Sequence, residues 1–163
     1  MRKQSKKYEK PLKPWDKTRI EEEAKLLQNY GLRRKREIWK IQSLLRNYRR
    51  IARGLAARRN KEKEKILLDK LFKIGLIGKD ADLDDVLALT IEKLLDRRLQ
   101  TLVFKKGMCT TMRQARQYIV HGHVAVDGRK VRWPSMIIPL SEESKISFYE
   151  NSKIKGGNNE KKP

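Results

Sequence analysis

The sequence predicts a mainly α-helical protein with a small β element. A helical N-terminal domain precedes a compact domain of two helices and a β-hairpin with a small antiparallel sheet. Apolar residues recur at steps of three and four in several segments before residue 122, as on one face of a helix. Asp127-Gly128 then separates two short β-prone runs, which is the pattern of a tight hairpin. We expect four units: a basic extended arm at 1–15, the helical domain at 16–96, the compact domain at 97–150 and a disordered tail at 151–163.

The positive charge of the chain is concentrated in two blocks. The net charge is +21, from 41 lysines and arginines against 20 acidic residues. Residues 1–60 hold 20 basic and 6 acidic side chains and residues 97–133 hold 9 and 1, whereas residues 61–96 hold 7 and 9. A thermophilic, lysine-rich surface would carry matching glutamates. The segregated excess instead indicates a polyanionic partner.

Other features of the composition narrow the class of protein. The single cysteine, Cys109, excludes an intramolecular disulfide and a multi-cysteine zinc site, and we interpret it as a small core residue. The sequence has no run of 18 apolar residues and no signal-peptide core, so we expect a soluble intracellular protein. A basic helix lying on an acidic membrane is disfavoured, because the basic residues are spread over several elements.

Residues 1–57 are expected to form the arm and two helices. Prolines interrupt residues 1–14, which should be extended. The first helix is capped by Asp16 or Thr18 and ends at Tyr30 before Gly31. The second covers residues 33–57, and its apolar face comprises Ile38, Ile41, Leu45, Tyr48, Ala52 and Leu55.

A different face of the second helix carries a row of arginines without acidic partners four residues away. The row consists of Arg46, Arg49, Arg50 and Arg53. Like charges at this spacing repel one another, so the row is favourable only beside an anion. We therefore predict that this face contacts the polyanionic partner, the alternative being a merely solvated basic face.

The segment 61–96 is expected to be helical and not to bind the polyanionic partner. A helix covers residues 61–75, a short capped turn 82–86, and Thr90 opens another helix. The carboxylates at 82–85 could suggest a Mg²⁺ or Ca²⁺ site, but their spacing fits no calcium loop, so we interpret them as helix caps. The lysines that alternate with glutamates are interpreted as solvated: Lys61, Lys63 and Lys65.

The compact domain should begin with two helices. One runs over residues 97–107, and the other over 112–121, capped by Thr110 or Thr111 and ended by Gly122. The apolar face of the second helix comprises Met112, Ala115, Tyr118 and Ile119. A neighbouring face carries Arg113, Arg116 and Gln117, and the arginines suit phosphate.

The remainder of this domain is expected to form the small sheet. Trp133-Pro134 closes the second strand of the hairpin, and residues 136–138 and 145–149 should add to the sheet. We interpret the three tryptophans as packing residues: Trp15, Trp39 and Trp133. The alternative, a platform on which a base stacks, concerns first Trp133 beside the basic hairpin.

Two stretches resemble a known family. RRLQTLVFKKG and TTMRQARQYIVHGHVAVDGRKV, between residues 97 and 131, resemble the S-four-type RNA-binding domain, a compact α-L unit. KKYEKPLKPWDKTRIEEEAKLLQNYGLRRKREIWKIQSLLRNYRRIARGLA is similar to the start of the archaeal and eukaryotic branch of the small-subunit ribosomal S-four family, called S-nine in the eukaryotic cytosol. The resemblance covers residues 8–148. Some bacterial members carry a cysteine-rich zinc knuckle that has no counterpart here, so we expect no metal and no cofactor.

The resemblance also implies which residues of the compact domain contact RNA. They are Arg97, Arg98, Lys105, Lys106, Arg113, Arg116, Gln117, His121, His123, Arg129, Lys130 and Arg132. To these we add, from the charge pattern, Lys6 and Lys7 of the arm and Arg46, Arg49, Arg50 and Arg53. The two histidines could suggest a metal pair or a catalytic base. We interpret them as RNA contacts or helix caps, because no acid or cysteine follows at ligand spacing and no nucleophile pairs with them.

The function that the resemblance implies is a structural one in the small ribosomal subunit. A protein of this family binds the 5′ domain of small-subunit ribosomal RNA, nucleates subunit assembly and contributes to translational accuracy in the cytoplasm. Its partners would be that RNA, neighbouring small-subunit proteins and mRNA where it enters the subunit, with no membrane and no small-molecule substrate. We expect no enzymatic activity, since no part of the chain is left for a catalytic domain. The alternative is a non-ribosomal architectural nucleic-acid-binding protein or RNA chaperone.

Overall fold

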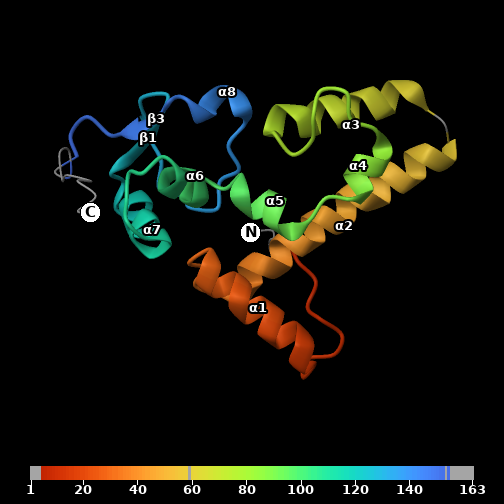
Figure 1. The fold of residues 1–163 in the computed structure, drawn as a ribbon, viewed down its shortest axis with the longest axis horizontal. Helices are drawn as coiled ribbons and strands as arrows, with labels where there is room; N and C mark the ends of the chain where they lie inside the picture. Colours follow the sequence, from red (N-terminus) through yellow and green to blue (C-terminus); the bar gives the residue numbers. More distant parts are fainter. Residues whose placement is uncertain (1–4, 59, 153, 155–163) are drawn as a thin grey trace, which may run out of the picture.

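A computed structural model of the protein describes residues 5–58, 60–152 and 154, and it confirms the predicted fold class (Figure 1). The helices are α1 (Lys17–Asn29), α2 (Lys35–Arg58), α3 (Lys61–Ile74), α4 (Leu83–Leu87), α5 (Ile91–Asp96), α6 (Leu99–Lys105), α7 (Met112–His121) and α8 (Leu140–Glu143). The strands are β1 (Val124–Val126), β2 (Arg129–Lys130) and β3 (Ile146–Phe148). The long helix α2 carries α3 and α4 along one side, and α6, α7 and the sheet gather near its N-terminal end (Figure 1).

The helix ends follow from local side-chain chemistry. Thr111, one of the two predicted caps of α7, accepts a hydrogen bond from the backbone N–H of Gln114 at 3.2 Å. Thr90 caps α5 in the same way. Gly122 ends α7 with φ of 76°, the left-handed conformation that glycine adopts without strain. Asp16 is the N-cap residue of α1, but its side chain makes no capping bond there.

The apolar side chains form two clusters. The first lies among α2, α3, α4 and α5 and contains Ile41, Leu45, Tyr48, Ala52, Leu67, Leu71, Leu76, Val86, Leu89, Leu94 and Leu95. The second lies among α6, α7 and the sheet and contains Leu99, Leu102, Val103, Cys109, Ala115, Ile119, Val124, Val126, Val131, Ile138 and Ile146. Cys109 is thus the core residue that the sequence predicted, and burial raises the pKa of its thiol to about 11.

The sheet has the strand order β2-β1-β3, with both pairs antiparallel. Asp127 and Gly128 have φ of 52° and 74°, as a type I′ turn requires at both central residues. The prediction that residues 136–138 add a strand to this sheet is wrong. Their backbone instead pairs with the start of α6, through an isolated bridge between Ile137 and Arg98. The short helix α8 was not predicted.

The two ends of the described chain lie against the rest of the protein. Residues 5–15 form no helix or strand, but the ring of Tyr8 packs on Trp39 with centroids 5.9 Å apart. Ser152, placed by the sequence analysis in a disordered tail, is buried, and its hydroxyl lies 3.0 Å from Nδ1 of His123. The remaining predictions for the arm at 1–4 and for the tail at 153 and 155–163 concern residues outside those described.

Replacing Ile119 by Asp should unfold the compact domain, because Ile119 is fully buried and a carboxylate there would have no partner. Val120, the next residue of α7, is 50% exposed, so Val120→Asp is a matched control that should fold. Circular dichroism during thermal unfolding measures both variants. A cooperatively folded Ile119→Asp protein would show that the core is misplaced.

Candidate nucleic-acid interface

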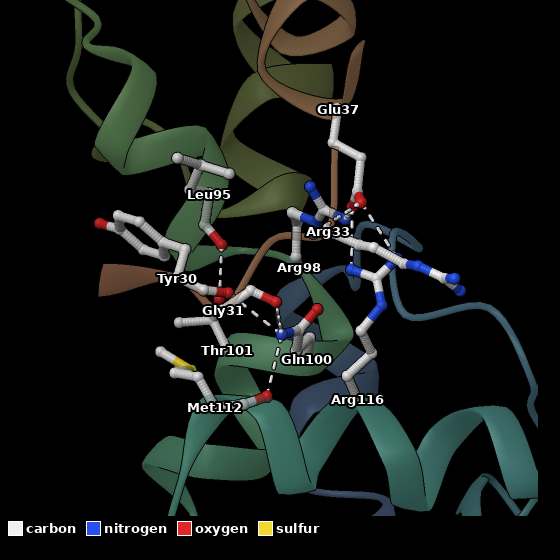
Figure 2. Close-up of polar contacts among 10 residues, drawn as sticks. All are labelled: Tyr30, Gly31, Arg33, Glu37, Leu95, Arg98, Gln100, Thr101, Met112 and Arg116. Atoms are coloured by element: carbon white, nitrogen blue, oxygen red, sulfur yellow. Dashed lines mark hydrogen bonds and ion pairs between the residues drawn. The ribbon is translucent and has the colours of Figure 1, made fainter. Parts of the chain in front are cut away.

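One carboxylate ties the start of α2 to the compact domain. Glu37, in the first turn of α2, accepts a hydrogen bond from Arg98 at 2.7 Å and two from Arg116 at 3.0 and 3.2 Å (Figure 2). The backbone N–H of Arg33 donates to the same carboxylate at 3.3 Å. Arg98 is the N-cap residue of α6 and Arg116 lies on α7, so Glu37 joins three helices.

Burial makes these charges depend on one another. Arg98 is 3% exposed, and burial lowers the pKa of its guanidinium although Glu37 acts in the opposite direction. Burial also raises the pKa of Glu37, but the hydrogen bonds from Arg116 and Arg98 outweigh it and hold that pKa below its ordinary value. The Glu37 carboxylate is therefore ionised at neutral pH. Removing any one of the three charges would leave an uncompensated charge in a buried position, which is strongly destabilising.

A second link lies beside the first and consists of uncharged groups. The side-chain amide nitrogen of Gln100 donates to the carbonyls of Tyr30, Gly31 and Met112 at 3.1, 3.2 and 2.9 Å (Figure 2). Gly31 has φ of 56°, and a Cβ at this position would lie 2.9 Å from Cβ of Met112. Glycine thus allows the turn between α1 and α2 to approach the start of α7.

Two arginines that were predicted to contact RNA are internal. Arg97 is 9% exposed and donates to Glu143 at 2.7 Å and to the carbonyl of Ile138 at 3.0 Å. Arg98, 3% exposed, is held by Glu37. These positions correct the expectation that both side chains lie on an RNA-facing surface, because they present almost no surface to a partner. They hold elements of the protein together.

The residues of the predicted basic face of α7 differ in exposure and in partners. Arg113 and Gln117 are exposed, whereas Arg116 is half-buried and bound to Glu37. Across the hairpin, Arg129 and Arg132 are also exposed. Within the described part of the chain, Arg113, Arg129 and Arg132 form no ion pair, so they retain their full charge for an anionic partner.

The remaining predicted residues of the compact domain have local partners. Lys105 pairs with Asp96 at 3.1 Å, and Lys106 donates to two carbonyls near β3. The ammonium of Lys130 lies 5.4 Å from the centroid of the Tyr149 ring. The two histidines lie at the C-terminal end of α7, with ring centroids 6.4 Å apart: His121, its last residue, is exposed, and His123 is half-buried.

The arginine row on α2 is largely open to solvent. Arg50 and Arg53 are exposed, and Arg50 donates to Asn47 at 3.0 Å. Arg49 is half-buried and donates to the carbonyl of Leu89 at 2.6 Å. Arg46 is exposed but bound to Glu9 of the arm, so the arm lies beside this row and brings its exposed lysines with it, Lys6 and Lys7.

Four exposed basic residues around the start of α2 were not among the predicted contacts. They lie near Glu37, whose carboxylate joins α2 to α6 and α7: Arg33, Arg34, Arg36 and Lys40. The run of four basic residues at 33–36 was the available signal. Next to them is a groove of about 420 Å³, lined by Lys40, Arg116, Leu44 and Ser135 among others.

The tryptophan prediction holds at one position of three. Trp39 packs as expected, and its indole N–H donates to Glu23 at 2.9 Å. Trp15 and Trp133 are 90% and 68% exposed, so the prediction that they are packing residues is wrong. Both follow sequences rich in proline or basic residues, where local pattern alone does not fix burial.

Residues 5–58, 60–152 and 154 contain no group of three or more His, Cys, Asp or Glu side chains placed to hold a metal ion. The acids of α4 act as predicted: Asp85 accepts a hydrogen bond from the backbone N–H of Asp82 at 3.1 Å. None of the helices in these residues is long and apolar enough to cross a membrane.

Comparison with known proteins confirms the resemblance seen in the sequence. The family model described as "Ribosomal protein S4/S9 N-terminal domain" matches residues 2–96, and the "S4 domain" model matches residues 97–144. "Small ribosomal subunit protein uS4" of Methanothermobacter thermautotrophicus is 46% identical over 157 residues, which cover 94% of this chain and 92% of that protein. Proteins of the same name from Korarchaeum cryptofilum and Methanosphaerula palustris are 48% and 45% identical, over 90% and 93% of this chain and 89% and 88% of their own.

Replacing Glu37 by Gln should lower the free energy of unfolding at pH 7 by about 3 kcal/mol, because Arg98 would lose its buried counter-charge. The pKa of Glu37 is lower in the folded state than its ordinary value of 4.5, so the stabilising effect of the Glu37 carboxylate is complete above that pH. It disappears as the pH falls through the folded-state value. The difference between wild type and variant should therefore shrink in acid, as urea unfolding at several pH values will measure.

A matched control for this experiment is Glu21→Gln. Glu21 is 59% exposed and lies 4.0 Å from Lys17, so its removal should change stability little at any pH. Equal unfolding midpoints for the Glu37 and Glu21 variants would contradict the structural role of the Glu37 link.

Proposed function

The chain belongs to the small ribosomal subunit protein uS4 family, and from this premise we propose that it is a structural protein of the small subunit that binds small-subunit ribosomal RNA. The observation that carries the proposal is the Glu37 link. It sets the start of α2, with its exposed arginines, directly beside the S4 domain, although Glu37 and Arg98 are 61 residues apart in sequence. A pair of basic surfaces in fixed relative position suits an RNA that is itself folded.

The proposed RNA contacts are the exposed basic and polar residues of the two blocks. They are Lys6, Lys7, Arg33, Arg34, Arg36, Lys40, Arg46, Arg50, Arg53, Lys105, Lys106, Arg113, Gln117, His121, Arg129, Lys130 and Arg132. Arg97 and Arg98 are left out because they are internal. Arg49, Arg116 and His123 are left out because they are half-buried and bonded to Leu89, Glu37 and Ser152. The S4 domain and the helical unit before it would act together, with residues 16–96 and 97–150 as the two units. Phosphate contacts supply affinity, and the fixed geometry supplies the preference for folded RNA.

The finer features of the proposal follow from the family. The RNA would be the 5′ domain, bound early so that the protein nucleates subunit assembly. In the assembled cytoplasmic ribosome it would contact neighbouring small-subunit proteins and lie near the mRNA where it enters, and it would contribute to translational accuracy. No enzymatic step is part of this role, since its mechanism is to neutralise RNA helices and hold them in place.

Binding to three nucleic acids across a salt series tests this function. The protein should prefer a 5′-domain fragment of small-subunit ribosomal RNA over unrelated RNA and duplex DNA of equal length, and the preference should persist as salt rises. Equal affinities that fall together with salt would favour the alternative, an architectural protein or RNA chaperone that acts only as a polycation.

The double variant Arg113→Glu, Arg129→Glu should weaken binding to the 5′-domain fragment on the order of tenfold or more, and lower the slope of log affinity against log salt by about one unit per lost phosphate contact. Both side chains are exposed, so folding should be unaffected. The matched control, Lys61→Glu with Lys65→Glu, makes the same change of charge on α3 and should bind nearly as wild type. Filter binding measures affinity, and circular dichroism checks the fold. A normal affinity for the Arg113 and Arg129 variant would remove this face from the interface.

A further inference from the structure

Trp133 is a large apolar side chain that the structure leaves in solvent. It is 68% exposed, although it directly follows the hairpin and lies next to the core of the S4 domain. Val131, two residues before Trp133, and Ile138, five residues after it, are buried. The exposed indole offers a large, flat apolar surface that a partner can cover.

The backbone that carries Trp133 is fixed. The carbonyl of Trp133 accepts a hydrogen bond from the N–H of Met136 at 3.2 Å, which closes a turn. The N–H groups of Gln100 and Leu99, at the start of α6, donate to the carbonyls of Pro134 and Met136 at 3.3 and 2.8 Å. The backbone of this turn is already ordered, so binding a partner at Trp133 costs little further backbone entropy.

Two exposed arginines precede Trp133 in the chain. Arg132 is the residue before it, and Arg129 begins β2 four residues earlier. The two following residues, Pro134 and Ser135, line a groove that Lys40, Arg116 and Glu37 also line. Arg116 and Glu37 are bonded to each other, and Lys40 is the exposed cation of this groove. A partner here should therefore combine a flat apolar surface with negative charge.

An unpaired nucleotide has both properties. Its base offers a π-face for stacking on an aromatic ring, and its phosphates suit the exposed cations Arg132 and Lys40. An apolar patch on a neighbouring protein would cover the indole but would gain nothing from the cations. Trp15 is also exposed, but the residue after it is Asp16, which disfavours a phosphate at that position.

We propose that Trp133 is a stacking platform for an unpaired base of the ribosomal RNA, with the phosphates beside that base held by Arg132 and by Lys40. The proposal rests on the RNA-binding function proposed above and adds to it a specific requirement. The bound RNA must present a base that is not paired, at a junction, bulge or loop, next to the S4 domain.

Intrinsic fluorescence gives a direct test in a Trp15→Phe background. Trp39 remains, half-buried and bonded to Glu23, and Trp133 is then the exposed indole. Adding the 5′-domain fragment of small-subunit ribosomal RNA should quench the fluorescence of this protein. Most of the quenching should disappear when Trp133→Phe is introduced, because stacking of a base on the indole causes it.

Affinity supplies the second readout. Trp133→Ala should weaken binding to the 5′-domain fragment on the order of tenfold, whereas Trp133→Phe, which keeps an aromatic ring, should retain most of the affinity. Neither change should alter binding to a fully paired RNA duplex, which has no base to offer. Ile66→Ala is the matched control, since Ile66 is 67% exposed but lies on α3, away from the basic blocks.

Two results would overturn the proposal. One is a Trp133→Ala protein that binds the 5′-domain fragment with wild-type affinity and without loss of quenching. The other is an equal loss for the fragment and the paired duplex, which would mean a general contact. The Arg113→Glu, Arg129→Glu variant then distinguishes failure of the stacking proposal from failure of the RNA-binding proposal. If this variant still weakens binding to the 5′-domain fragment, the RNA-binding function stands and only the stacking on Trp133 is wrong.

Discussion

The arrangement of this protein depends on one buried cluster of charge, Glu37 with Arg98 and Arg116. The cluster connects the first turn of α2 to the start of α6 and to the middle of α7. The chain at Asp96, the bonds of Gln100 and the packing of α8 against the end of α3 near Gly75 also join the two parts. The position of each basic surface relative to the other is therefore set in part by a carboxylate that itself lies between them.

A buried ion cluster is not the most stabilising way to join two parts of a protein. Removing these charges from water is costly, and apolar side chains of similar volume often stabilise as well or better. An apolar contact, however, can slide or repack, whereas a carboxylate bonded to two guanidinium groups admits few geometries. A protein that must present two cationic surfaces to a folded RNA gains from that precision, and the neighbouring bonds from Gln100 to three carbonyls serve the same end.

Features set by local sequence could be predicted, and features set by distant contacts could not. The helices, the Thr90 and Thr111 caps and the Asp127-Gly128 turn depend on neighbouring residues, and the structure contains them. The burial of Arg98 depends on Glu37, 61 residues earlier, and no periodicity in the sequence indicates that pairing. The same limit explains the tryptophans, since whether an indole is covered is decided by elements far away in the chain.

Adjacent arginines in this protein consequently do different things. Arg113 and Arg116 lie one helical turn apart on α7, yet the first faces solvent and the second is bound inside to Glu37. Net charge alone would count both toward binding a polyanion, and so would a motif that names both. The structure distinguishes them, because the guanidinium of Arg116 is already paired with the Glu37 carboxylate and that of Arg113 has no ion pair in the described residues. The internal arginines hold the elements in place, and the exposed arginines supply positive charge at the surface. Loss of an internal arginine should therefore impair RNA binding by changing the shape of the protein, whereas loss of an exposed one should impair it by removing a charge.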